Sequence, residues 1–263
     1  MKFLLSLLMV VSALYSNIYY SKVEPYEIKK ISSNVIGVVL FANENMIGEK
    51  LPNNAYIKVD DELDKEELKY VNEKLEYSKS TVEMNEKILQ NLESSLNKKR
   101  ENYKKVQALK IKSSVEKDNE FYNLVTSENS FLATQKEINS LKTQISDLQL
   151  RKAQLQRSMS DKSLSAKDYT LYELNVKVGE VVNKGTPLAT LLDTSRAILT
   201  IYLNEEDVIG AKSKVVYING NETEYKISRL LNIADSKNIS KYMAQIVIKS
   251  PKVFSKLVKI ELK

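Results

Sequence analysis

The segment Lys110-Ile111-Lys112-Ser113-Ser114-Val115-Glu116 interrupts a long helical pattern in the middle of the chain. Between Pro52 and Gly179 there is neither Gly nor Pro, and so long a stretch without the two helix breakers indicates continuous helix. Ser113 and Glu116 have the spacing of a capping box, which starts a new helix. We therefore expect one helical arm to end before this segment and a second arm to begin within it.

Both arms carry heptad spacing of apolar residues. One series runs through residues 68–106 and a second through residues 124–159, which is typical of a coiled coil. Polar residues at a few of these positions, among them Asn85, weaken the seam and can fix its register. Residues 62–165 therefore predict an antiparallel helical hairpin about 70 Å long, with its tip at about residues 108–115.

The regions on either side of the hairpin read as β structure. Residues 26–61 and 169–195 contain alternating β-branched and aromatic residues separated by turn signals. Residues 196–263 predict further strands, with Asn219-Gly220-Asn221 as a hairpin turn. Because the hairpin returns the chain to its starting point, we expect the first two regions to lie together.

The second of these regions, from Val176 to Asp193, reads VKVGEVVNKGTPLATLLD. This segment resembles the second half of a biotinyl/lipoyl-like domain, and residues 36–60 resemble the first half. The order of parts resembles the periplasmic adaptor, or membrane fusion protein, family of HlyD and AcrA type. The resemblance implies an α+β fold: a long antiparallel coiled-coil hairpin inserted in a split lipoyl-like β domain (26–61 and 169–195), followed by a small β-barrel (196–263). It also implies that the modified lysine of carrier domains is absent, so no cofactor is expected.

The N-terminus has the features of an export signal. Lys2 precedes the apolar run from Phe3 to Leu14, which has the length of a signal-peptide core. We assign residues 1–20 to a signal peptide, either cleaved or retained as an uncleaved anchor. The body of the protein is then expected in the periplasm, associated with the inner membrane through its transporter or through that N-terminal segment.

The composition argues against an enzyme. The chain has no Cys and no His, so it lacks a cysteine nucleophile, the commonest metal ligand and the usual general base near neutral pH. Gly179, Gly185 and Pro187 are turn formers rather than a phosphate loop. We expect no catalytic residue, no metal and no cofactor. The 15 Tyr residues are dispersed along an exported chain, so we expect no nucleic-acid partner.

The candidate partner-binding residues lie at the hairpin tip. Basic residues are concentrated here and could dock on an acidic protein rim. Alternatively, they simply form a solvated helix end, where Lys interacts favourably with the helix dipole. The resembled family often carries Arg, Leu and Ser at fixed spacing at the tip, where they contact the outer-membrane duct. Here Asn102, Val106 and Ser113 take those positions, so the Ser matches, the apolar residue is conservatively changed and the Arg is absent. Ser113 is equally explained as a helix N-cap. The predicted site comprises Asn102, Lys104, Lys105, Val106, Lys110, Lys112 and Ser113.

The resemblance implies a periplasmic adaptor subunit of a tripartite efflux or type I secretion system. Its partners would be an inner-membrane transporter of ABC or RND type and a TolC-like outer-membrane channel, and the chain would form a homo-oligomeric ring. Apolar residues near the tip, Phe121, Tyr122 and Val125, could contact neighbouring hairpins or pack in the seam. The alternative is a structural or tethering coiled-coil envelope protein with no transporter partner.

Overall fold

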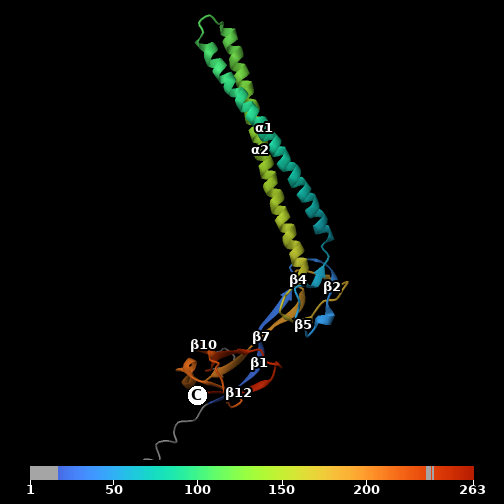
Figure 1. Ribbon diagram of the computed structural model, residues 1–263, viewed down its shortest axis with the longest axis vertical. Helices are drawn as coiled ribbons and strands as arrows, with labels where there is room; N and C mark the ends of the chain where they lie inside the picture. The colour runs from blue at the N-terminus through green and yellow to red at the C-terminus, as the bar shows by residue number, and fades with distance from the viewer. Residues whose placement is uncertain (1–16, 235–237, 239) are drawn as a thin grey trace, which may run out of the picture. The chain divides into compact units, whose positions relative to one another are not determined.

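The computed structural model describes residues 17–234, 238 and 240–263. The chain divides into two compact units, one made of residues 60–162 and the other of the flanking sequence on both sides. The predicted fold class, a helical hairpin inserted in a split β domain, is confirmed (Figure 1).

The first unit is the hairpin. Helix α1 spans Glu62–Ala108 and helix α2 spans Ser114–Lys162. Their seam is apolar nearest the open end, where Val71 and Leu75 pack with Leu155. Ion pairs flank the seam. In one of them, the Arg151 guanidinium donates to both carboxylate oxygens of Glu67 at 2.6 Å. The helices thus have the amphipathic pairing that the heptads predict.

The second unit consists of β-strands, short helices and loops. The elements before the hairpin are β1 (Ile18–Ser32), β2 (Gly37–Ala42), η1 (Glu44–Met46) and β3 (Ala55–Val59). Strand β4 (Ser163–Ser165) follows the hairpin directly. The remaining elements are β5 (Thr170–Leu174), β6 (Val181–Val182), β7 (Pro187–Leu203), α3 (Glu205–Val208), η2 (Ala211–Ser213), β8 (Val216–Ile218), β9 (Asn221–Glu222), β10 (Ile227–Ala234), β11 (Tyr242–Lys249) and β12 (Leu257–Leu262).

These strands form two sheets. The larger has the order β10-β11-β7-β1-β12-β8-β9, with β5 also paired to β7, and the smaller has the order β4-β3-β2-β6. Strands β3 and β4, which precede and follow the hairpin, pair directly, with Ile57 opposite Leu164. Strands β2 and β6 also pair across the insertion. Residues more than a hundred positions apart in the sequence therefore complete one β unit.

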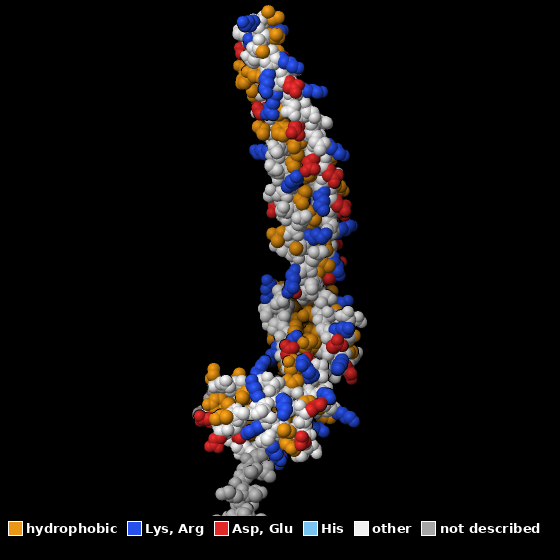
Figure 2. Space-filling model, turned by 60° about the vertical axis from the view of Figure 1, so that its left-hand side comes forward, with side chains coloured by type: hydrophobic (Ala, Val, Ile, Leu, Met, Phe, Trp, Pro, Cys, Tyr) orange, Lys and Arg blue, Asp and Glu red, His pale blue; other side chains and the backbone are white. Residues whose placement is uncertain are grey.

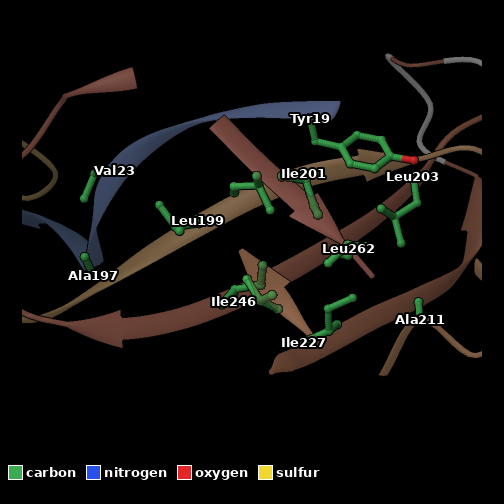
Figure 3. Close-up of a cluster of buried hydrophobic side chains, with 13 residues drawn as sticks. Tyr19, Val23, Ala197, Leu199, Ile201, Leu203, Ala211, Ile227, Ile246 and Leu262 are labelled. Carbon is green, nitrogen blue, oxygen red and sulfur yellow. The ribbon is translucent and has the colours of Figure 1, made fainter. Parts of the chain in front are cut away.

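The β unit has two hydrophobic clusters. We call the part around the first the lipoyl-like half; its buried residues include Val39, Ile57, Leu171 and Leu191. We call the part around the second the barrel half, and Figure 3 shows its core, with Leu199, Ile201 and Ile246 pointing into one cluster. Strands β1 and β7 pair along most of their length and contribute to both halves.

Two features differ from the sequence-based expectation. Strand β1 starts at Ile18 and pairs with β12, so residues 18–25 join the barrel half that the sequence placed at 196–263 alone. Ile18–Tyr20, assigned from the sequence to the end of the signal segment, are part of this strand, while residues 1–16 lie outside the described residues. Strand β7 also runs without a break through the expected boundary at 195/196.

The turn expected at Asn219-Gly220 is present between β8 and β9. Both residues have positive φ angles, 52° and 84°, as a two-residue type I′ hairpin turn requires. The short helix α3 carries Glu205, Glu206 and Asp207 in its first turn.

Candidate docking surface at the hairpin tip

The connection between α1 and α2 is built around a capping box. The Ser113 backbone N–H and hydroxyl each donate to the Glu116 carboxylate at 3.0 Å, and the Glu116 N–H donates to the Ser113 hydroxyl at 3.3 Å. These bonds satisfy amide groups that have no partner at a helix start. The residue pair identified in the sequence therefore begins α2, and Ser113 is an N-cap.

Glu116 also binds Lys112 across one helical turn, with 2.8 Å between the ammonium and the carboxylate. The hydrogen bond from Lys112, helped by those from Ser113, lowers the pKa of Glu116 to about 2. The carboxylate is consequently ionised at neutral pH, and Lys112 is a partly neutralised charge rather than a free one.

The residues predicted from the sequence lie in the last two turns of α1 and in the loop that precedes α2. All but Val106, which is half-buried, are exposed. In structural order they are Asn102, Lys104, Lys105, Val106, Lys110, Lys112 and Ser113. Lys104, Lys105 and Lys110 have no ion-pair partner within the described part of the chain.

The returning helix changes the charge of the tip. The sequence of α1 and the loop shows a strongly basic tip, but the first turns of α2 supply Glu116, Asp118 and Glu120. Residues 98–120 hold eight basic and four acidic side chains. Lys117 crosses the tip and donates to the Gln107 carbonyl at 3.2 Å. The tip is therefore basic overall, with its excess positive charge on α1 and the loop.

Apolar side chains accompany these charges, as Figure 2 shows in orange at the tip. Ile111 is 88% exposed, and Leu109 and Val115 are exposed beside it. Ile111 is not among the site residues predicted from the sequence. An isolated apolar residue in a basic loop is the sequence signal that could have identified it. Phe121 lies 5.9 Å from Tyr103 and from Tyr122, measured between ring centroids.

Phe121 is thus partly used within the hairpin, where Tyr103 of the opposite helix covers one side of it. Tyr122 is exposed and Val125 is half-buried. Of the three residues considered for contacts between hairpins, Tyr122 is the one whose side chain is largely available.

Among the described residues, no group of three or more acidic side chains is placed to hold a metal ion. In the same part of the chain, no helix is both long enough and apolar enough to span a bilayer.

Comparison with known proteins relates this chain to others by fold. No family model matches it, and no curated protein matches its sequence. Among solved structures, MacA from Actinobacillus actinomycetemcomitans superposes with a TM-score of 0.69 at 13% identity, over 94% of this chain and 78% of MacA. The membrane fusion protein Spr0693 from Streptococcus pneumoniae has a TM-score of 0.56 at 12% identity, over 94% of this chain and 99% of Spr0693. A putative efflux transporter from Bacteroides eggerthii has a TM-score of 0.54 at 14% identity, over 94% of this chain and 68% of that one.

These matches define the fold as that of the membrane fusion, or periplasmic adaptor, proteins. The resemblance read from residues 36–60 and 176–193 is confirmed at this level.

Proposed function

We propose that the chain is a non-enzymatic periplasmic adaptor of a tripartite efflux or type I secretion system. It would link an inner-membrane transporter, of ABC or RND type, to a TolC-like outer-membrane channel. The observation that carries the proposal is the fold, shared with MacA and Spr0693 over 94% of the chain. Fold alone does not define a function, and the tip chemistry supplies the independent support.

The two units would have different roles. The β unit would bind a transporter through its exposed sheet surfaces. The hairpin is a spacer: α1 has 47 residues, which at 1.5 Å per residue extends about 70 Å. Several copies arranged as a ring would enclose a conduit, with exposed hairpin residues such as Tyr122 at the contacts between neighbours. In this role the chain positions its partners and catalyses nothing.

The tip is suited to an encounter with an acidic rim. Lys104, Lys105 and Lys110 are exposed, and within the described residues they form no ion pair. Such charges raise the association rate and set orientation, and their effect weakens with added salt. Ile111, beside them, offers an apolar contact that desolvation can stabilise once the surfaces meet.

Replacing Lys104, Lys105, Lys110 and Lys112 together with Gln should reduce capture of the channel by roughly tenfold at low ionic strength and flatten the salt dependence. The measurement is the yield of channel cross-linked through a photoreactive residue at position 111, with the cross-linked partner identified by mass spectrometry. The matched control replaces Lys69, Lys74, Lys79 and Lys87 with Gln. These lysines are exposed on α1 away from the tip, and their removal changes the net charge equally.

Equal losses in the tip and control variants would show that net charge, rather than the tip, governs capture. An unchanged yield in the tip variant would contradict the role assigned to its lysines. If no transporter and no channel cross-links to the native chain, the tethering alternative holds and the adaptor proposal is wrong.

A further inference from the structure

Within the described residues, the chain passes between the two halves of the β unit twice, once in β1 and once in β7 (Figure 1). The cluster of the lipoyl-like half and the cluster of the barrel half share no residue. Residues 24–30 of β1 and 192–196 of β7 lie between the clusters and belong to neither. We call these two segments the joint. The halves are therefore packed separately and connected through the joint.

At the joint the larger sheet narrows to two strands. Strand β5 pairs with β7 as far as Leu192, and β11 pairs with β7 from Arg196 onward. Strand β12 pairs with β1 only as far as Lys22. Between these limits β1 and β7 have only each other as neighbours in the sheet. A ribbon of two strands is marginally stable without further neighbours, so this part of the β unit resists bending least.

The pairing of β1 with β7 is also interrupted at the joint. Pro25 is opposite Ala197. Two positions further on, Glu27 is opposite Asp193 rather than Ser195, so β7 has two extra residues at this point. A bulge leaves residues unpaired, bends the strand and increases its twist. The joint therefore combines a thin sheet with a break in its ladder of hydrogen bonds.

A hollow of about 570 Å³ lies beside the joint. Tyr26 and Glu27 line it from the joint, while Arg229 of β10 and Gln245 of β11 line it from the barrel half. Bending at the joint would narrow or widen this hollow. The hollow thus gives the two halves room to move toward each other.

Glu27 and Arg229 carry opposite charges and face the same hollow, but they form no ion pair in this structure. The Glu27 carboxylate binds groups on the lipoyl-like side of the joint. It lies 3.4 Å from the Lys29 ammonium and accepts a hydrogen bond from the Tyr169 hydroxyl at 3.0 Å. Among the described residues, no carboxylate lies within ion-pair distance of the Arg229 guanidinium. A carboxylate that approached Arg229 would find its donors available.

Two further charged side chains lie near the hollow. The Arg196 guanidinium stacks on the Tyr26 ring, 3.8 Å from its centre. Glu24 is opposite Ile198, which lines the hollow, although Glu24 itself does not. Glu24 therefore offers a second carboxylate on the same strand against which the role of Glu27 can be tested.

We propose that the joint is a hinge with two states and that Glu27 exchanges partners between them. In the open state, which the structure shows, Glu27 binds Lys29 and Tyr169. In the closed state the hollow is narrower and Glu27 binds Arg229, so the barrel half turns toward the lipoyl-like half. Each state pairs the carboxylate at a solvent-exposed site, where an ion pair contributes little, so the two states differ little in free energy. The proposal does not depend on the proposed function, because a tethering protein could contain the same hinge.

The chain has no Cys, so two introduced thiols can carry spin labels in the full-length protein. Tyr172→Cys labels β5 of the lipoyl-like half, and Leu231→Cys labels β10 of the barrel half. Both side chains are exposed. Double electron–electron resonance then gives the distribution of distances between the labels. We expect two populations of distances, one for each state of the hinge.

Two substitutions should shift these populations in opposite directions. Arg229→Gln should reduce the closed population about two- to fivefold, because it removes an exposed ion pair that exists only in that state. Tyr169→Phe should raise the closed population, because it removes a hydrogen bond to Glu27 that exists only in the open state. Lys241→Gln is the matched control for Arg229→Gln, since Lys241 is exposed in the barrel half and does not line the hollow.

A single distance population in the native protein would overturn the proposal. Equal effects of Arg229→Gln and Lys241→Gln would also overturn it, because net charge would then explain the shift. Loss of the closed population in Glu24→Gln would show that Glu24 is the carboxylate that binds Arg229, and would overturn the role of Glu27. Opposite shifts in Arg229→Gln and Tyr169→Phe, with no change in the two other variants, would support the hinge.

Discussion

Leu171→Ala should lower the free energy of unfolding of the β unit by about 2–5 kcal/mol, the usual cost of removing a buried leucine side chain and leaving a cavity. Leu171 is fully buried in the lipoyl-like half. It lies opposite Leu191 of β7, and its backbone N–H donates to the Glu49 carbonyl at 3.1 Å while its carbonyl accepts from Gly48 at 2.7 Å. One side chain thus stands where the segments before and after the hairpin meet.

The measurement is urea unfolding followed by the near-ultraviolet circular dichroism of tyrosine, because Tyr56 is buried in the same cluster. Tyr172→Ala is the matched control. This neighbour points to the other face of β5 and is exposed, so its removal should change the stability by less than about 0.5 kcal/mol. Similar losses for both variants would mean that the lipoyl-like half is not packed as described.

Asn85→Leu should stabilise the hairpin by about 1–3 kcal/mol. Asn85 is 9% exposed in the seam, and among the described residues nothing accepts a hydrogen bond from its side-chain amide. The neighbouring Glu86 binds Lys142 at 2.9 Å, so Asn85 lies level with the segment of α2 near Ile138. Leucine at this position would replace an unsatisfied amide with an apolar contact.

Thermal and urea unfolding followed at 222 nm measures this effect, since the hairpin contributes most of the helical signal. Asn91→Leu is the control, because Asn91 is exposed on the same helix. A loss of stability in Asn85→Leu would show that the amide has a role in the seam that the described contacts do not provide. A buried polar residue can also fix register at the expense of stability, so the stabilised variant should tolerate shifted pairings of α1 and α2.

The hairpin could be predicted because its signals are local. The absence of Gly and Pro, the heptad series and the spacing of Ser113 and Glu116 act within a few turns of helix. The hydrogen bonds between Ser113 and Glu116 confirm the capping box. The lipoyl-like segments were recognisable for a similar reason, since the turns at Gly179 and Gly185 have positive φ angles of 89° and 88° that restrict the choice of residue.

The parts that escaped prediction depend on contacts remote in sequence. Nothing near Ile18 indicates that β1 pairs with β12, more than two hundred residues away, and the preceding apolar run hides the start of the strand. The charge of the tip was overestimated from α1 alone, because Glu116, Asp118 and Glu120 join it only when α2 returns. The residues proposed for partner binding stay predictions of the sequence, supported by their exposure at one end of the hairpin.

The central claim is that β segments separated by the hairpin complete one body. The chain has no Cys, so Val38→Cys with Val181→Cys gives a pair of thiols without competition. These residues are paired between β2 and β6, and paired strand residues have Cα atoms about 4.5–5.5 Å apart, within the range for a disulfide. Mild oxidation of the full-length protein should give a nearly complete intramolecular disulfide, seen as a mobility shift that reducing agent reverses, whereas Val38→Cys with Tyr172→Cys should not link. Free thiols in the first variant, or cross-links only between molecules, would contradict the account.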